Sequence, residues 1–333
     1  MKIFPSIFLI IILSWLISVH FAYGQEGRSL LPITQNGKCG YIDKTGKMVI
    51  KPQFDYSDGF YEGLARVQIG EKLGFIDENG SIVIQPNFDS VLFFSNGLAP
   101  VQIDDKWGYI DNTGNLVINP KFDFAFFFSE GLAKVKIDKK WGFVNNSGET
   151  IIKPQFDWVG DFSEGLAVIQ VGEKQGYLDK NGKIVVEPKF DFASEFSEGL
   201  AWVLEDCESK EFTFSYIDKT GKPVSIIGRN FEFGLNFSEG LAAVYIDDKF
   251  GFIDKTGNIV IEAKFDKALV FSEGLAPAQV DDKWGDINRK GDFVIKPQFD
   301  MTFGFHKGVA MVEVGDKRGY IDNSGKYIWK PTK

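Results

Sequence analysis

The chain has 333 residues, and its 37 Lys and Arg against 46 Asp and Glu give a net charge of −9 at neutral pH. An acidic surface repels phosphate backbones and anionic lipid, so we expect no nucleic-acid partner. Only Cys39 and Cys207 are present, which excludes a disulfide scaffold. We expect two free thiols, with a single bridge as the alternative.

Residues 1–24 have the pattern of a secretory signal peptide. Lys2 precedes an apolar stretch that closes on Ala22-Tyr23-Gly24, where small residues occupy the positions that a signal peptidase reads. Cleavage before Gln25 would give a secreted or periplasmic protein with no membrane insertion. The alternative is an uncleaved anchor, because the uncharged stretch from residue 3 to residue 23 is long enough to span a bilayer.

An internal repeat of 34 residues organises the rest of the chain. One glycine marks it, at Gly40, Gly74, Gly108, Gly142, Gly176, Gly251, Gly285 and Gly319. The first and last segments align with internal ones, so we predict nine units in a single domain over residues 25–333, each from the Leu-Ala segment to the Pro. Such periodicity is typical of repeat architectures.

The unit that starts at Gly97 predicts three strands followed by a loop. Ala99, Val101 and Ile103 alternate along the first strand, and residues 107–110 form the second. The next four residues, Asp-Asn-Thr-Gly, are typical of a tight hairpin turn. The third strand, residues 116–118, is apolar on both faces, and this predicts that it is covered on both sides.

The second face of the first strand carries very different residues from unit to unit. The equivalent position holds Arg66, Lys134, Trp202 and Ala243. We therefore expect this position not to be closely packed.

A 34-residue unit cannot bury enough surface to fold alone, so the units must stabilise one another. The sequence therefore predicts an all-β array of nine three-stranded units. Propellers usually have four to eight blades of four strands, which favours an open, curved, solenoid-like array. A closed propeller-like ring is the alternative.

The repeat resembles the WG-repeat family, named for the dipeptide seen at Trp107-Gly108, Trp141-Gly142 and Trp284-Gly285. The motifs Gly-Tyr-Ile-Asp, Pro-x-Phe-Asp and Glu-Gly-Leu-Ala recur in register with it. The resemblance implies a bacterial-type β-repeat protein and carries no particular activity. The Trp position also holds Cys39 and Arg318, so Trp is not required for folding.

The segment Phe-Ser-Glu-Gly-Leu-Ala occurs five times in identical form, first at residues 128–133. Looser copies replace its Glu by Asn96 or Lys307, but its Gly is present in every copy. A catalytic Glu could not be exchanged for Lys, whereas a turn that needs a residue without Cβ must keep Gly. The pattern therefore indicates a turn between units.

Residues typical of catalysis are scarce after the signal segment. His306 is the one histidine there, so neither a His-based triad nor a zinc site can be assembled. The Asp that follows Phe in seven units is interpreted as a turn cap. Asp77-Glu-Asn-Gly80 lacks the ligand spacing of a calcium loop. We expect no enzyme activity, no metal and no cofactor.

Candidate functional residues are those that break the repeat. An insertion lengthens the turn between Leu204 and Phe214 and carries Glu205, Asp206 and Glu208. Asp286 replaces an aromatic residue found in the other units, and we expect it to reach water or a cation such as Arg289 or Lys290. The remaining candidates are aromatic: Trp107, Trp141, Trp202 and Trp284.

Two functional hypotheses follow. The first is an exported, non-enzymatic repeat scaffold that binds a protein partner or ligand at the cell envelope or outside the cell. The alternative is a carbohydrate-binding module in which Trp and Tyr rings stack on sugars. A carboxylate-based hydrolase is a third, weaker possibility, because it needs two carboxylates facing each other across a cleft.

Overall fold

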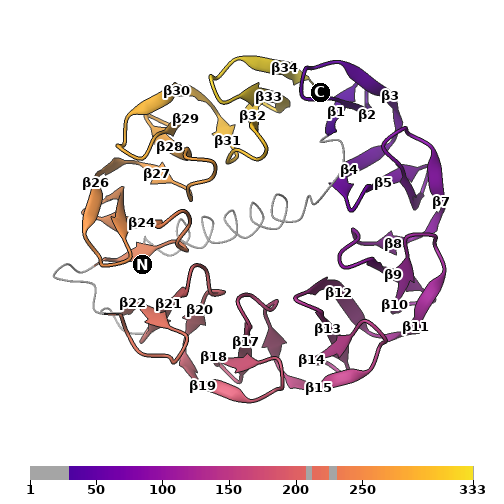
Figure 1. The fold of residues 1–333 in the computed structure, drawn as a ribbon, viewed down its shortest axis with the longest axis horizontal. Coiled ribbons are helices and arrows are strands. Elements are labelled where there is room, and N and C mark those ends of the chain that lie inside the picture. Colours follow the sequence, from indigo (N-terminus) through magenta and orange to yellow (C-terminus); the bar gives the residue numbers. More distant parts are fainter. Residues whose placement is uncertain (1–29, 208–211, 225–230, 333) are drawn as a thin grey trace.

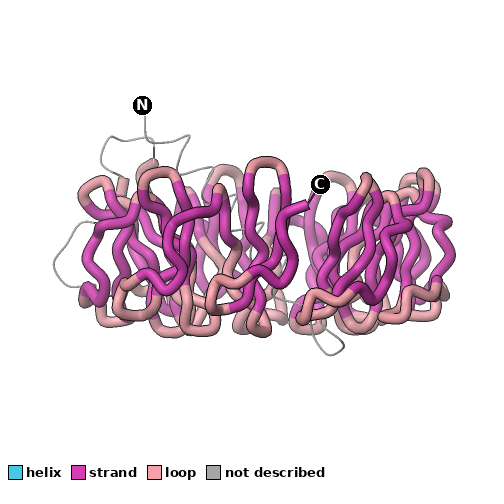
Figure 2. The backbone as a smooth tube through the Cα atoms, turned by 90° about the horizontal axis from the view of Figure 1, so that it is seen from above, coloured by secondary structure: helices cyan, strands magenta, loops and turns pink. Residues whose placement is uncertain are grey.

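The computed structural model describes residues 30–207, 212–224 and 231–332, which form nine antiparallel sheets arranged in a ring (Figure 1). Seen edge-on, the ring is a flat disc with loops on both faces (Figure 2). We number the sheets as blades 1 to 9 in chain order. Within the described residues, seven blades have four strands, while blades 1 and 6 have three.

The strands are numbered in chain order, and each occupies one of four positions in its blade, from the ring axis outward. The innermost strands are β4 (Tyr56–Tyr61), β8 (Ser90–Val91), β12 (Phe124–Ser129), β16 (Trp158–Val159), β20 (Phe192–Ala193), β23 (Phe233–Gly234), β27 (Lys267–Ala268) and β31 (Met301–Thr302). The second strands are β1 (Leu31–Gln35), β5 (Leu64–Ile69), β9 (Leu98–Ile103), β13 (Leu132–Ile137), β17 (Leu166–Val171), β21 (Leu200–Glu205), β24 (Leu241–Ile246), β28 (Ala276–Val280) and β32 (Val309–Val314).

The third strands are β2 (Lys38–Ile42), β6 (Lys72–Ile76), β10 (Lys106–Asp111), β14 (Lys140–Asn145), β18 (Lys174–Asp179), β22 (Thr213–Asp218), β25 (Lys249–Asp254), β29 (Lys283–Ile287) and β33 (Lys317–Asp322). The outer strands are β3 (Met48–Phe54), β7 (Ile82–Phe88), β11 (Leu116–Phe122), β15 (Thr150–Phe156), β19 (Ile184–Phe190), β26 (Ile259–Phe265), β30 (Phe293–Phe299) and β34 (Tyr327–Thr332).

The glycine that marks the repeat is needed because the outer strand arches over it. In blade 3, a Cβ on Gly108 would lie 2.4 Å from the carbonyl oxygen of Ile118 and 2.8 Å from the nitrogen of Pro120. The strand register is irregular at the same point. The neighbouring Trp meets no such restriction, which explains why this glycine recurs while the Trp varies.

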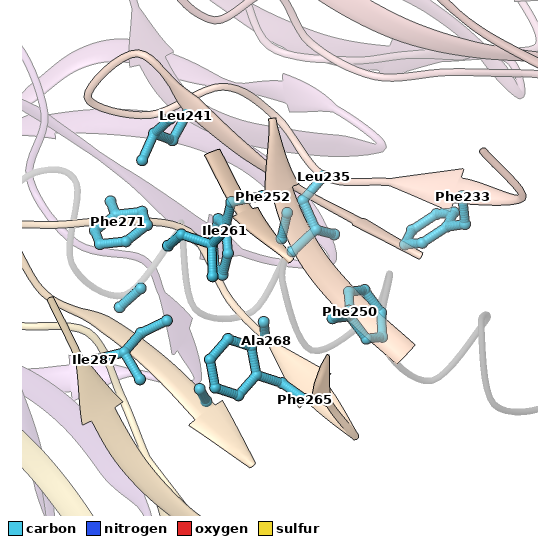
Figure 3. Close-up of a cluster of buried hydrophobic side chains, with 13 residues drawn as sticks. Phe233, Leu235, Leu241, Phe250, Phe252, Ile261, Phe265, Ala268, Phe271 and Ile287 are labelled. Atoms are coloured by element: carbon cyan, nitrogen blue, oxygen red, sulfur yellow. The ribbon is translucent and has the colours of Figure 1, made fainter. Parts of the chain in front are cut away.

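The hydrophobic core lies between blades. Figure 3 shows one such cluster, in which Phe252 and Ile261 of blade 7 pack with Phe271 and Ile287 of blade 8. Equivalent clusters join the other neighbouring blades. Each unit therefore buries its apolar surface against the next one, as expected for a repeat protein.

The Phe-Ser-Glu-Gly-Leu-Ala segments form the hairpin turn between the innermost and second strands of a blade, as between β12 and β13, and their side chains contact the next blade. Ser129 donates a hydrogen bond to the carbonyl oxygen of Phe162 in the next blade (2.7 Å), and the Glu130 carboxylate accepts one from the backbone N–H of Gly165 (3.1 Å). Glu130 and Gly131 both have positive φ, 51° and 85°, as a two-residue type I′ hairpin turn requires. The turn is confirmed, but the prediction that it lies between units is wrong, because it joins β12 to β13 within blade 4. The side chains of Ser129 and Glu130 make the contact with the next blade.

The Asp that follows Phe has a similar double role on the opposite face of the ring. Asp55 accepts hydrogen bonds from the backbone N–H of Gly70 (2.8 Å) and from the Lys38 ammonium of the preceding blade (2.5 Å). The same Lys–Asp pair recurs at six further junctions. The predicted turn cap is therefore confirmed, together with an ion pair between blades.

The ring closes where blade 9 meets blade 1. The sheet of β31 to β34 is built entirely from residues 301–332, so this junction shares no strand with blade 1. Side chains make it instead: the Tyr320 hydroxyl donates to the Pro32 carbonyl oxygen (2.7 Å), and the Lys44 ammonium donates to the Lys307 carbonyl oxygen (2.6 Å). Ile33 and Ile42 pack on Val309 there.

Three expectations need correction. The array is a closed ring, the alternative to the open array that the sequence favoured, because side-chain contacts close it without a shared strand. The segment read as a loop contains a fourth, innermost strand, which is only two residues long in most blades. The outer strand is covered on one side only: Ile118 is buried, while Leu116 and Val117 are 48% and 46% exposed.

Candidate functional site

The predicted Trp residues lie in four different blades, and most of them are buried. Trp107, Trp202 and Trp284 are between 4% and 8% exposed. They pack against other apolar side chains, as Trp107 does on Phe124, with ring centroids 4.8 Å apart. The expectation that these three form exposed stacking faces is wrong, because the rings fill the space between strands. Trp141 is partly buried.

The insertion residues lie at the turn after β21, in blade 6. Asp206 is exposed, and Glu205 approaches Lys189 at 4.0 Å. Glu208 lies outside the residues that the structure describes. Cys207 is a free thiol on blade 6 and Cys39 a free thiol on blade 1. The insertion and the Trp residues therefore do not converge on one patch.

Asp286 lies on β29 of blade 8, two residues after Trp284, and is completely buried. Its expected cation is absent: Arg289 instead donates to the backbone carbonyl of Glu239 (2.7 Å). The hydroxyl of Thr302, in the next blade, donates to the Asp286 carboxyl at 3.3 Å. The sequence identified this residue as unusual but assigned it the wrong surroundings.

The side chains that differ most between units instead come together at the ring axis. The position directly before the Phe of Phe-Ser-Glu-Gly-Leu-Ala lies on the innermost segment of blades 2 to 9 (Figure 1). We call this set the inner collar, together with Tyr61 and Lys134, which contact it; its members at the position itself are Gly59, Phe93, Phe127, Asp161, Glu195, Asn236, Val270 and Gly304.

Aromatic rings form one part of the inner collar. The ring of Phe93 stacks on Tyr61 of the preceding blade with a centroid separation of 4.4 Å. It also meets Phe127 of the following blade at 4.6 Å. Such offset contacts stabilise aromatic pairs beyond the area they bury. The collar is therefore continuous from blade 2 to blade 4.

Charged groups form the next part, in blades 4 to 6. The Lys134 ammonium lies 2.9 Å from the Asp161 carboxylate and 4.4 Å from the ring centroid of Phe126. Lys134 is only 3% exposed and Asp161 14%. Two charges buried to this extent are costly unless they are paired, so this pair fixes the contact between blades 4 and 5.

Glu195 extends the charged part into blade 6. Its carboxylate accepts a hydrogen bond from the backbone N–H of Asp161 at 3.4 Å. Burial, and then the nearby Asp161 carboxylate, raise the pKa of Glu195 to about 7, while Lys134 acts in the opposite direction. The two carboxylates share one cation, so this part of the collar carries excess negative charge when Glu195 ionises.

A second charged group lies beside the aromatic part. Arg66 donates to the Asp58 carboxylate of its own blade (2.7 Å) and to the Val91 carbonyl oxygen of the next (2.6 Å). Tyr56 donates to the same carboxylate (2.5 Å). Arg66 and Lys134 hold the position expected to be loosely packed, yet most of its members are buried. That expectation is wrong, and Arg66 and Lys134 both reach into the next blade.

Sequence reasoning did not select Asp161, Glu195 or Phe93 as candidates. The signal was present, because alignment of the units places these residues in one column directly before the repeated Phe. That column falls in the segment predicted to be a loop. Its importance appears only in the structure, where members of this column from neighbouring blades contact each other. Within the described residues, no group of three His, Cys, Asp or Glu side chains is arranged to hold a metal ion.

Eight segments match the family model of the WG-containing repeat, at residues 40–72, 74–107, 107–141, 141–174, 176–206, 214–250, 250–284 and 285–317. The chain belongs to this family. The structure of this WG-repeat protein has nine blades. The last matched segment includes β31 and β32 of blade 9, while nearly all of β33 and the whole of β34 follow it.

Solved structures resemble the WG-repeat ring at low sequence identity. A eukaryotic initiation factor crystal structure is 11% identical with a TM-score of 0.64, over 92% of this chain and 96% of that chain. Hsv2p from Kluyveromyces lactis is 10% identical with a TM-score of 0.44, over 73% and 97%. The first of these likenesses shows the fold and nothing of the function.

An extracellular domain of a two-component system protein from B. thetaiotaomicron is 10% identical to the WG-repeat chain, with a TM-score of 0.34. The match covers 94% of this chain and 57% of that one. No curated protein matches the sequence significantly. Among the residues that the structure describes, no helix has the length and apolar character to cross a bilayer.

Proposed function

We propose that this WG-repeat protein is an exported, non-enzymatic binding scaffold that holds a protein partner at the inner collar. One observation carries the proposal: residues of very different chemistry occupy equivalent positions in successive blades, and those of blades 3 and 4 and of blades 5 and 6 contact each other. The rest of each unit is repeated and serves the fold. Function in repeat proteins resides on such continuous surfaces, which the stacked units present.

The composition of the collar supports a protein partner. Phe93 in the collar and Arg66 beside it are both partly exposed, and both belong to the residue types that are enriched at the centres of protein interfaces. Both signs of charge lie next to the aromatic rings, at Lys134 and Glu195. A glycan receives less support, because three of the four Trp residues expose almost none of their rings.

The arrangement of the carboxylates supports a non-enzymatic role. The repeated Asp residues are bound by lysines and backbone N–H groups, as at Asp55. Asp161 and Glu195 are neighbours, yet Lys134 occupies an oxygen of Asp161. Such a pair is not two free carboxylates across a cleft, which a glycosidase requires.

Capture from an envelope extract tests the binding surface. Wild-type protein should retain a partner, and Glu195→Gln should reduce the retained amount at least tenfold because it removes the charge that Lys134 does not neutralise. Glu173→Gln, which makes the same change at an exposed turn, is the matched control. Equal retention by both variants would show that the partner binds elsewhere.

Export is tested separately. Expression of the full chain followed by N-terminal sequencing should give a mature protein that starts at Gln25, found outside the cytoplasm. Recovery of the intact N-terminus in the membrane fraction would instead identify residues 1–24 as an anchor. Recovery from the cytoplasm would contradict export.

A further inference from the structure

Asp286 is a buried acid in a position that the other units give to an aromatic residue. The equivalents are Tyr41, Phe75, Tyr109, Phe143, Tyr177, Tyr216, Phe252 and Tyr320. In blade 3, the Tyr109 hydroxyl donates to the Phe126 carbonyl oxygen of the next blade (2.7 Å). Asp286 has no ring to fill that place, and its side chain is completely buried between blades 8 and 9.

A second substitution accompanies it across the blade junction. Thr302, on β31 of blade 9, is also completely buried and donates its hydroxyl to Oδ2 of Asp286. The equivalent positions hold small residues, Ser57, Val91, Ala125, Val159, Ala193, Gly234 and Ala268. Oδ1 of Asp286 has no hydrogen-bond partner among the described residues. The junction thus contains a carboxyl with one long hydrogen bond.

No charge faces this carboxyl from the strands packed around it. Pro277 on β28 and Ile295 on β30 lie opposite Asp286 in the sheet, and Thr302 meets it from β31. None of these three side chains can titrate or carry a charge. Within the described part of the chain, the influences on Asp286 are its burial and the Thr302 hydroxyl.

We propose that Asp286 makes the contact between blades 8 and 9 a proton-dependent joint. The neutral carboxyl is tolerated inside the junction, whereas the ionised carboxylate would be buried there without a cation or an adequate set of donors. Burying a charge in this way is far more costly than burying a neutral carboxyl. Ionisation therefore weakens the packing of β29 on β31 and favours separation of blade 9. This inference does not depend on the proposed function.

The direction of the pH effect follows from linkage. Burial raises the pKa of Asp286 from 3.8 to about 7, and the Thr302 hydrogen bond acts in the opposite direction. The folded state therefore holds this proton more tightly than the unfolded state. The stability that it contributes is complete below pH 3.8 and is lost progressively as the pH rises to about 7. The loss corresponds to roughly a thousandfold change in the opening equilibrium.

His306, in the hairpin turn of blade 9, changes stability with pH in the opposite direction. Its pKa is lowered from 6.5, chiefly by burial and then by Lys307. Its contribution to stability is therefore present above pH 6.5 and is lost as the pH falls through its folded pKa. Stability that declines toward neutral pH is thus a signature of Asp286 that His306 cannot produce.

Hydrogen exchange at pH 5, 6, 7 and 8, corrected for intrinsic rates, tests the joint. In the wild type, protection of the β29 and β31 amides should fall by roughly fifty- to ninetyfold across this range, most of it between pH 5 and pH 7. The Asp286→Asn variant keeps the shape but cannot titrate at this position, so its protection should not fall as the pH rises. Asp286→Tyr restores the residue of the other units and provides a second non-titrating variant. The β10 amides around Tyr109 are the internal control.

Two outcomes would overturn the proposal. Parallel pH profiles for the wild type and Asp286→Asn would show that this carboxyl does not control the junction. An equal loss of protection in β10 and β29 would show that the effect is spread over the ring and not placed at the joint. If Asp286→Asn does not fold, Asp286→Tyr gives the same comparison.

Discussion

The outer and inner parts of each blade differ in how much their residue types vary from unit to unit. In the outer part, Gly108 and its glycine equivalents are kept because a strand crosses directly over them. Blade 6 has Ser215 at this position, and its described sheet has no outer strand. In the inner part, the collar position accepts Phe93, Asp161, Glu195 or Gly304 within one ring. The difference teaches that close packing of the strands within one blade limits which residue types a position such as Gly108 can hold. Contacts around the axis need only match their two neighbours, so they are free to carry specificity.

The largest effect is expected inside the collar. Lys134→Met leaves the Asp161 carboxylate buried without its cation, so the free energy of unfolding should fall by about 3 kcal/mol. Urea denaturation provides the measurement. The double variant Lys134→Met/Asp161→Asn should recover part of the loss. Lys106→Met removes one of the exposed repeated pairs and should have little effect; a loss as large as that of Lys134→Met would contradict the distinction.

A somewhat smaller effect is expected in the outer part. Gly108→Ala places a Cβ against backbone atoms that cannot move aside, which should cost about 2 to 3 kcal/mol. Gly131→Ala is the matched control: its Cβ would meet open space, but its φ is 85°, so the cost should be about 1 kcal/mol. Thermal unfolding of both variants compares them. Equal losses would show that φ, and not the crossing strand, restrains Gly108.

The smallest effect is expected where Glu130 contacts the next blade. Glu130→Ala removes a hydrogen bond to Gly165 and an ion pair with Lys180 (3.0 Å). Both are near the surface, so the loss of stability should be about 0.5 kcal/mol. The measurement is the urea midpoint, and it should depend on salt. A loss equal to that of Gly131→Ala would mean that the carboxylate, rather than the turn, determines this segment.

Local features of the fold could be predicted from the sequence. The spacing of Gly108 and Gly142 gave the unit length, and the Asp-Asn-Thr-Gly segment located the hairpin. The unit length and the hairpin depend on turns and strands within one unit, where the backbone conformation determines which residue types are favoured. The choice between ring and open array could not be made, because it depends on small angles between units that no single residue determines.

The candidate site was harder to predict, because its residues meet only across blades. Lys134 and Asp161 are 27 positions apart, and nothing in either unit alone indicates that they pair. The Trp residues attracted attention by their size, yet the same size places them in the core. Asp286 was recognised as unusual, but its burial depends on β28, β30 and β31 together.

The junction between blades 9 and 1 gives the ring a defined response to force. Since no strand is shared there, pulling on the two ends of the domain should first separate these blades while every sheet stays intact. Further pulling should remove blades one at a time from the ends. Each event would release one 34-residue unit, or roughly 110 to 120 Å of extended chain. A stretched ring would therefore extend in a series of similar steps, after an initial small opening.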